Sequence, residues 1–172
     1  MTRILFSNLG YAKGIDGSLQ QHIKGFGRHF YCALPSQSQV LAQFKDLLNN
    51  EAPDICCLVE VDQGSFQSGY INQMATLMDE KYQFHDIAGK YGEHSRIGRM
   101  PLHKGNSNGF LSVSALEFKR LYFKYGTKRL VYRLSLPGDV SIFLPIFHYR
   151  NLSVKSSLKI CDRLSRMFRE RL

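Results

Sequence analysis

The chain has 172 residues, of which 44% are hydrophobic, 12% are aromatic and 22% are charged, and its formal net charge is +9. This length and composition predict one folded domain and exclude a largely disordered chain. No apolar run approaches the roughly 18 residues that a membrane span needs. The positive charge favours a phosphate-bearing partner, such as nucleic acid or a phospholipid headgroup; the alternative is that it is solvated surface only.

The amino terminus and the cysteines indicate where the protein works. Residues 1–6 hold too short an apolar stretch for a secretory signal peptide. The four cysteines show no paired spacing, and the adjacent Cys56 and Cys57 are expected to be buried thiols on opposite faces of a strand. We therefore expect a cytoplasmic protein. A cytosolic protein exported by a specialised secretion system would have the same features.

The first predicted element is a strand over residues 3–8, which ends at Asn8. Residues 9–34 then form a connection with five glycines, several cations and several aromatic residues. Connections of this length are usually functional or disordered, and the aromatic residues argue against disorder. We interpret it as a substrate-facing loop in which Arg28 and His29 meet phosphate oxygens. The alternative is a loop that packs its own aromatic residues and leaves its charges in water.

Residues 36–50 show the apolar spacing of an amphipathic helix. Residues 55–59 are a continuous apolar run, which a Pro-Asp turn precedes and Glu60 follows. Such a run predicts a strand buried on both faces. The helix between the two strands makes them parallel neighbours, so Asn8 and Glu60 should meet at one edge of the sheet. A carboxylate there is costly to bury unless it is paired or holds a metal.

Further along, the pattern predicts a second amphipathic helix over residues 66–80 and a strand over residues 82–88. Residues 89–104 are polar and basic without periodicity, and they include Arg96 and Arg99. Another strand follows within residues 104–112. It carries two asparagines, Asn106 and Asn108.

Three antiparallel strands with one solvated face are expected over residues 117–125, 128–136 and 140–147, separated by turn signals. Pro145 indicates that the last of them lies at an edge or carries a bulge. His148 ends that strand, and residues 152–172 read as a helix with one basic face.

Taken in order, these motifs resemble those of the endonuclease/exonuclease/phosphatase superfamily, the Mg²⁺-dependent phosphoesterases related to deoxyribonuclease I. Pro53-Asp54-Ile55 with Glu60 is similar to its "PDI…E" motif, residues 104–112 resemble its "GNAILS" strand with Asn108 at the Asn position, and His148 stands at the His of "HL". The chain departs from the pattern at three positions, which are Val59, Ser107 and Tyr149. Asn106 leaves the alignment of Asn108 ambiguous by two residues.

The resemblance implies an α+β fold, the deoxyribonuclease I-like αββα sandwich. It implies Mg²⁺ (or Mn²⁺) on Glu60 with Asn8 nearby, and roles for Asn8, Asn108 and His148 at the scissile phosphate. Substrate phosphates would meet the basic loop residues Arg28, His29, Arg96 and Arg99. The implied activity is hydrolysis of phosphodiester or phosphomonoester bonds in DNA, RNA, a phosphoinositide or sphingomyelin.

The superfamily's later "GDFN" and "SDH" motifs do not occur in this sequence. The resemblance therefore treats residues 1–172 as one incomplete domain whose C-terminal strands are missing, either a fragment or a degenerate form. We expect weak or absent activity, with His22, His29 and His94 as the candidate bases, and a homodimer that covers the open sheet face. The alternatives are a non-catalytic remnant that binds phosphate, nucleic acid or membrane, and a structural domain whose motifs arose by chance.

Overall fold

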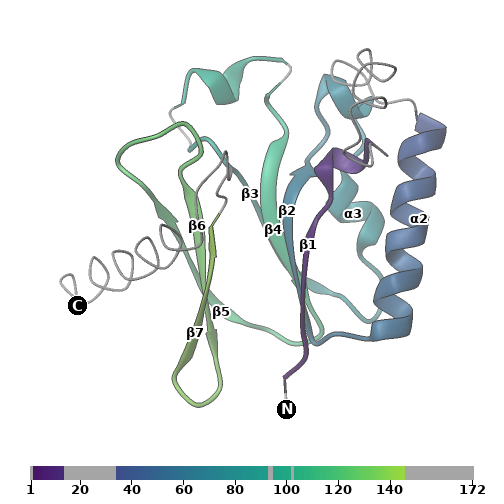
Figure 1. Cartoon of the computed structure of the whole chain (residues 1–172), viewed down its shortest axis with the longest axis vertical. Helices are drawn as coiled ribbons and strands as arrows, with labels where there is room; N and C mark the ends of the chain where they lie inside the picture. The colour runs from purple at the N-terminus through teal and green to yellow at the C-terminus, as the bar shows by residue number, and fades with distance from the viewer. Residues whose placement is uncertain (1, 14–33, 93–94, 102, 146–172) are drawn as a thin grey trace, which may run out of the picture.

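The structure is a computed structural model that describes residues 2–13, 34–92, 95–101 and 103–145. These residues form a mixed α+β fold with two β-sheets and few helices (Figure 1). None of the helices in these ranges is long and apolar enough to cross a membrane.

The first sheet contains the strands that the motifs predicted. Its order is β1-β2-β4-β3, with β1 at Ile4–Asn8, β2 at Ile55–Asp62, β4 at Asn106–Ser112 and β3 at Phe84–Gly89. Strands β1 and β2 are parallel, and the β2/β4 and β3/β4 pairs are antiparallel. The expected parallel pairing of the first two strands is confirmed. A helix lies between them in the chain, as the expectation required.

That helix, α2 (Leu34–Glu51), covers one face of the first sheet together with the short helix α3 (Gln73–Leu77) (Figure 1). Its buried residues Leu41, Phe44 and Leu48 are spaced one turn apart, and they pack with Cys56 and Leu58 of β2. The pattern over residues 36–50 therefore predicted this helix correctly.

The predicted helix over residues 66–80 is wrong. The segment instead forms a 3₁₀ turn, η3 (Phe66–Ser68), a break, and then α3. Gly69 and Tyr70 have φ of 59° and 65°, which no right-handed helix contains. The Asn72 side chain then accepts a hydrogen bond from the Ala75 amide and so caps a new helix.

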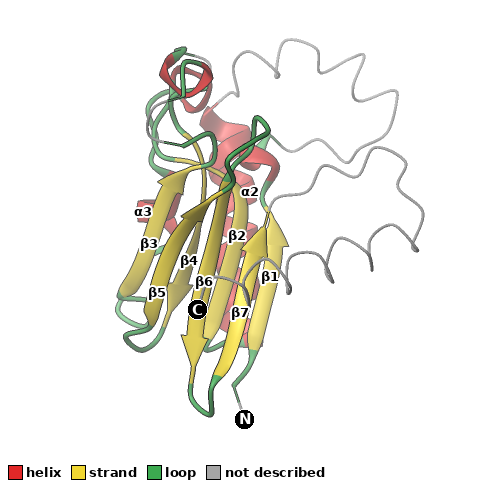
Figure 2. Ribbon diagram, turned by 90° about the vertical axis from the view of Figure 1, so that its left-hand side faces the viewer, coloured by secondary structure: helices red, strands yellow, loops and turns green. Residues whose placement is uncertain are grey.

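The second sheet, β5-β6-β7, packs against the other face of the first. Its strands are β5 (Glu117–Tyr122), β6 (Leu130–Leu136) and β7 (Val140–Pro145), all antiparallel. Leu130, Tyr132 and Leu134 of β6 form one apolar cluster with Cys57 of β2 and Phe110 of β4. The described residues thus form three layers, which are α2 with α3, the first sheet and the second sheet. The turned view shows the second sheet in front of the first (Figure 2).

Strand β2 places one cysteine in each of the two apolar clusters that lie on the opposite faces of the first sheet. Cys56 faces the helices and Cys57 faces the second sheet, as predicted. Burial raises the pKa of the Cys56 thiol to about 12 and that of Cys57 to about 11, so both stay protonated at neutral pH. Pro145 ends β7, an edge strand of the second sheet as described, in keeping with the expectation for a proline there.

Candidate functional site

The sequence predicted that Glu60 ends its strand, but the structure places Glu60 in a β-bulge within β2. Val59 pairs with Asn108 and Val61 with Ser107, so Glu60 is an extra residue with no partner on β4. Its φ is 56°, a strained value for a residue with a side chain. By alternation alone, Glu60 would share the helix-facing side of β2 with Cys56 and Leu58. The bulge gives that side to Val61 and frees the carboxylate from the apolar core.

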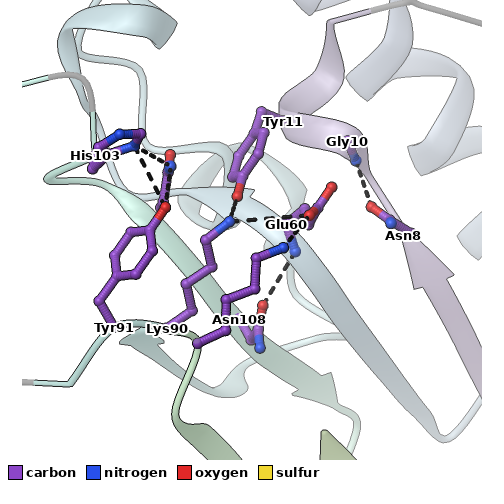
Figure 3. A network of polar contacts seen from close by, with 10 residues as sticks. Asn8, Gly10, Tyr11, Glu60, Lys90, Tyr91, His103 and Asn108 are labelled. Atoms are coloured by element: carbon purple, nitrogen blue, oxygen red, sulfur yellow. Dashed lines mark hydrogen bonds and ion pairs between the residues drawn. The ribbon is translucent and has the colours of Figure 1, made fainter. Parts of the chain in front are cut away.

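Asn108 and Asn8 stand on either side of this bulge. The Asn108 Oδ1 accepts a hydrogen bond of 3.2 Å from the Glu60 amide, and so supports the bulge. Asn8 is paired with Val59 in the parallel ladder, and its Oδ1 accepts a hydrogen bond of 2.8 Å from the Gly10 amide. Figure 3 shows the two asparagines flanking Glu60. The structure therefore brings together Asn8, Glu60 and Asn108.

Two lysines face the Glu60 carboxylate from other elements. Lys128 Nζ lies 3.4 Å from Glu60 Oε1, and Lys90 Nζ lies 4.0 Å from the same oxygen (Figure 3). Lys90 also donates a hydrogen bond to the Tyr11 hydroxyl, and its ammonium lies 4.6 Å from the centroid of the Tyr11 ring. The carboxylate is therefore partly buried, with 14% of its side chain exposed, and lies among cations and a phenol.

Tyr11 reaches this position because the backbone turns sharply after β1. Gly10, Tyr11 and Ala12 have φ of 52°, 58° and 52°, three successive residues in the left-handed region. The Tyr11 carbonyl accepts a hydrogen bond of 2.8 Å from the Gln73 side chain, which holds the turn in place. Strained backbone that the surrounding structure holds in place is typical of functional sites, and here it occurs at both Tyr11 and Glu60.

Burial and, to a smaller extent, the neighbouring charge of Lys128 together lower the pKa of the Lys90 ammonium to about 7. Only 3% of the Lys90 side chain is exposed, so loss of water outweighs the attraction of Glu60 at 4.0 Å. Near neutral pH, Lys90 therefore exists in both protonation states, and in its neutral form it can accept a hydrogen bond as well as donate one.

This pKa predicts how stability depends on pH. Between pH 7 and about pH 10 the unfolded chain keeps the Lys90 proton and the folded chain releases it, so the free energy of unfolding rises with pH. We expect a rise of about 2 kcal/mol between pH 7 and pH 9. Urea denaturation with a chelator present measures it. Lys90→Met should lose most of the rise and Lys119→Met, on exposed β5, should keep it; equal rises in all three proteins would contradict the assignment.

A second polar group adjoins this site through Tyr91. The Tyr91 hydroxyl lies 3.2 Å from Asn106 Nδ2 and 3.4 Å from His103 Nδ1, and the Lys90 ammonium lies 5.3 Å from the Tyr91 ring centroid. Burial lowers the pKa of His103, and the charges of Lys90 and Lys13 add to this effect. One polar group joins Glu60, Lys90 and Tyr11 and another joins Tyr91, His103 and Asn106, and the two meet where the Lys90 ammonium lies over the Tyr91 ring.

Asp62, two residues after Glu60, stabilises a turn. It is fully buried and accepts hydrogen bonds from the amides of Gly64 and Ser65, at 2.8 and 2.6 Å, and from the Ser65 hydroxyl at 2.5 Å. These contacts fix the chain as it leaves β2, which is the commoner role of an aspartate at a turn.

The other predicted site residues lie away from Glu60 in the chain or outside the described residues. Arg96 precedes and Arg99 ends a 3₁₀ turn, η4 (Ile97–Arg99), and both are exposed. Three predicted residues lie outside the described residues: Arg28, His29 and His148. The same holds for His22, His94 and the predicted helix over residues 152–172. Sequence reasoning did not single out Lys90, Tyr11 or Lys128 as site residues, although Lys90 follows directly on a strand end, where polar residues often serve a site.

The oxygen donors at the bulge fit a hard divalent cation. Glu60 supplies a carboxylate and Asn8 an amide oxygen with a second lone pair, and Mg²⁺ is usually held by one or two carboxylates together with water and substrate phosphate. Among the described residues, no group of three or more His, Cys, Asp or Glu side chains is placed to hold a metal. Any cation here would therefore depend on substrate oxygens for much of its binding.

Comparison of the sequence with protein-family models and with curated proteins found no match.

Proposed function

We propose that this chain carries the metal and phosphate site of a Mg²⁺-dependent phosphoesterase similar to the endonuclease/exonuclease/phosphatase superfamily. The observation that carries the proposal is the meeting of Asn8, Glu60 and Asn108 around one strained β-bulge. The three residues lie far apart in the sequence, and each stands at a position that resembles a motif residue of the superfamily. A carboxylate re-aimed by a bulge, away from the core, is more readily explained by a ligand than by packing.

The surrounding charges support a phosphate as the substrate group. Lys128 lies beside Glu60. Lys90 lies beside it as well and donates a hydrogen bond to the Tyr11 hydroxyl (Figure 3). Ammonium and hydroxyl donors of this kind can bind the oxygens of a phosphate placed next to the carboxylate. When bound, Mg²⁺ would neutralise phosphate charge and favour attack at phosphorus. The residues Glu60 and Asn8 would hold it.

The proposal also concerns the type of fold to which the two sheets belong. We infer that the two sheets form the core of a deoxyribonuclease I-like αββα sandwich. Its support is the face-to-face packing of the sheets and the two helices on the outer face of the first. Ile4 and Phe6 of β1, which are 44% and 58% exposed, belong to the face that the proposed homodimer would cover.

The site is tested by metal binding. Calorimetry with Mn²⁺ should show weak binding to the wild-type chain in the presence of inorganic phosphate, and Glu60→Gln should weaken it at least about tenfold, because a neutral amide replaces the carboxylate ligand. Glu117→Gln on exposed β5 is the matched control, since it loses the same charge at a distance from the site. Identical titrations for Glu60→Gln and the wild type would remove the metal role of Glu60.

The competing candidate is a phosphate-binding domain without catalysis, and one observation favours it. The Lys128 ammonium lies 3.4 Å from the Glu60 carboxylate, so a lysine can balance the charge of this group as a metal would. In that case phosphate would bind equally well with and without Mn²⁺. In the proposed phosphoesterase, Mn²⁺ and phosphate bind cooperatively, so the same calorimetry separates the two functions.

A further inference from the structure

A cavity of about 330 Å³ lies beside the candidate site, between the end of β3, the start of β4, the end of β5 and the turn η4. Its wall includes Tyr91, Arg99, His103, Lys104, Asn106 and Tyr122. Tyr91 of the wall follows Lys90 in the chain and contacts it, and Lys90 in turn lies 4.0 Å from Glu60, so these two side chains link the cavity to the candidate site. The volume is that of a small-molecule pocket.

The charged residues of the cavity wall favour an anion. Arg99 and Lys104 are exposed at its rim, and neither side chain has an ion pair with a described residue. Arg120, the third cation of the wall, is instead bound to the Asp86 carboxylate, with 2.8 Å between its Nε and Asp86 Oδ2. Two cations at one rim that pair with no carboxylate of the described residues are suited to bind phosphate oxygens.

Asn106 supplies a second, independent observation. Its side chain is 95% buried; its Nδ2 lies within hydrogen-bond distance of Tyr91 and His103, but its Oδ1 has no hydrogen-bond partner among the described residues. A buried polar atom of this kind is normally satisfied, so it indicates that a donor is supplied from the cavity. A hydroxyl group is such a donor, and a phosphate at neutral pH is mainly an acceptor.

We propose that this cavity is a subsite for a second phosphate of the same substrate molecule. The substrate would be a ring-shaped alcohol with two phosphates, one beside Glu60 and one between Arg99 and Lys104, and a ring hydroxyl would donate to Asn106 Oδ1. The chemistry is shared by an inositol bisphosphate and a nucleoside bisphosphate. This inference rests on the proposed function for the position of the first phosphate, whereas the residues of the subsite are its own.

The test compares bisphosphates with monophosphates by calorimetry on the full chain, at one fixed ionic strength and without metal. The two pairs are inositol 1,4-bisphosphate with inositol 1-phosphate, and adenosine 3′,5′-bisphosphate with adenosine 5′-phosphate. We expect the bisphosphate of one pair to bind about tenfold more tightly than its monophosphate. The pair that shows the gain identifies the substrate class. Equal affinities within both pairs would overturn the subsite.

Variants of the cavity wall show where the tighter binding of the bisphosphate arises. Arg99→Gln/Lys104→Gln should abolish the tenfold advantage, because it weakens binding of the bisphosphate far more than binding of the monophosphate. Lys119→Gln/Lys124→Gln removes the same charge from exposed positions outside the cavity wall and should keep the advantage. A gain that survives in the first variant, or disappears in both, would show that net charge and not the cavity is responsible.

The role of Asn106 is tested through the ligand, which avoids disturbing its bonds to Tyr91 and His103. Butane-1,4-diol bisphosphate has two phosphates and no free hydroxyl, and should bind several-fold more weakly than the preferred ring bisphosphate. Equal affinity would overturn the Asn106 contact. If Mn²⁺ binds at Glu60 but the bisphosphates gain nothing, only the subsite fails. If the gain depends on Arg99 and Lys104 but Glu60 binds no Mn²⁺, the subsite stands and the proposed phosphoesterase fails.

Discussion

Turnover of bis-p-nitrophenyl phosphate with Mg²⁺ is expected to be at least about 10²-fold slower for this 172-residue chain than for a chain extended by segments with the Gly-Asp-x-Asn and Ser-Asp-His motifs. The resemblance assigns activation of the attacking water to the Asp-His pair, which this sequence lacks. General base catalysis contributes about 10²–10⁴-fold in typical enzymes, and residues that act as a unit lose more than their separate shares.

Two variants of the extended protein serve as controls. Glu60→Ala and His148→Ala should each remove most of its turnover, and a chelator should abolish it. Rapid, chelator-sensitive hydrolysis by the 172-residue chain itself would contradict the expectation. It would show that the chain contains a base of its own, and loss of that activity in His29→Ala or His94→Ala would identify it.

Gly109→Ala is expected to lower the free energy of unfolding by about 3 kcal/mol, because overpacking at a buried backbone contact is among the costlier single changes. Gly109 lies in β4 directly after Asn108, and a Cβ there would overlap the Asp86 carbonyl oxygen and come within 2.5 Å of Met74 Cε. The carbonyl belongs to the β3 backbone and cannot move without breaking the ladder.

Gly89→Ala provides the matched control for this substitution. Gly89 ends the adjacent strand β3, and a Cβ added there meets no atom within 4 Å. It should change the free energy of unfolding by no more than about 0.5 kcal/mol. Urea denaturation of the two variants measures the difference. Similar stabilities would mean that β3 and β4 are not packed against Met74 as described.

Much of the first sheet could be predicted from the sequence, because its signals are local. The apolar run before Glu60, the helical spacing of Leu41, Phe44 and Leu48, and the turn residues around them all indicate the observed elements. The helix over residues 66–80 was wrong because its apolar spacing concealed two helix breakers. Gly69 takes a left-handed conformation, and Asn72 favours capping a helix over continuing one.

The sequence named some of the residues that meet at the candidate site, and the others could not be found without the tertiary structure. Asn8, Glu60 and Asn108 follow from strand ends and motif order. The bulge at Glu60 does not, since the β2 sequence reads as a regular strand and the extra residue is evident only against β4. Lys90, Tyr11 and Lys128 come from three separate elements and converge only when the sheets pack. No spacing in the sequence connects them.

The central claim is that Glu60 binds a divalent cation beside a phosphate. Anomalous diffraction from a crystal of the chain grown with Mn²⁺ and inorganic phosphate tests it most directly. The predicted result is one manganese peak roughly 2.0–2.2 Å from a Glu60 carboxylate oxygen, on the side of Asn8, with a phosphate between the manganese and Lys128. A Glu60 carboxylate that still pairs only with Lys90 and Lys128, with manganese bound elsewhere, would contradict it.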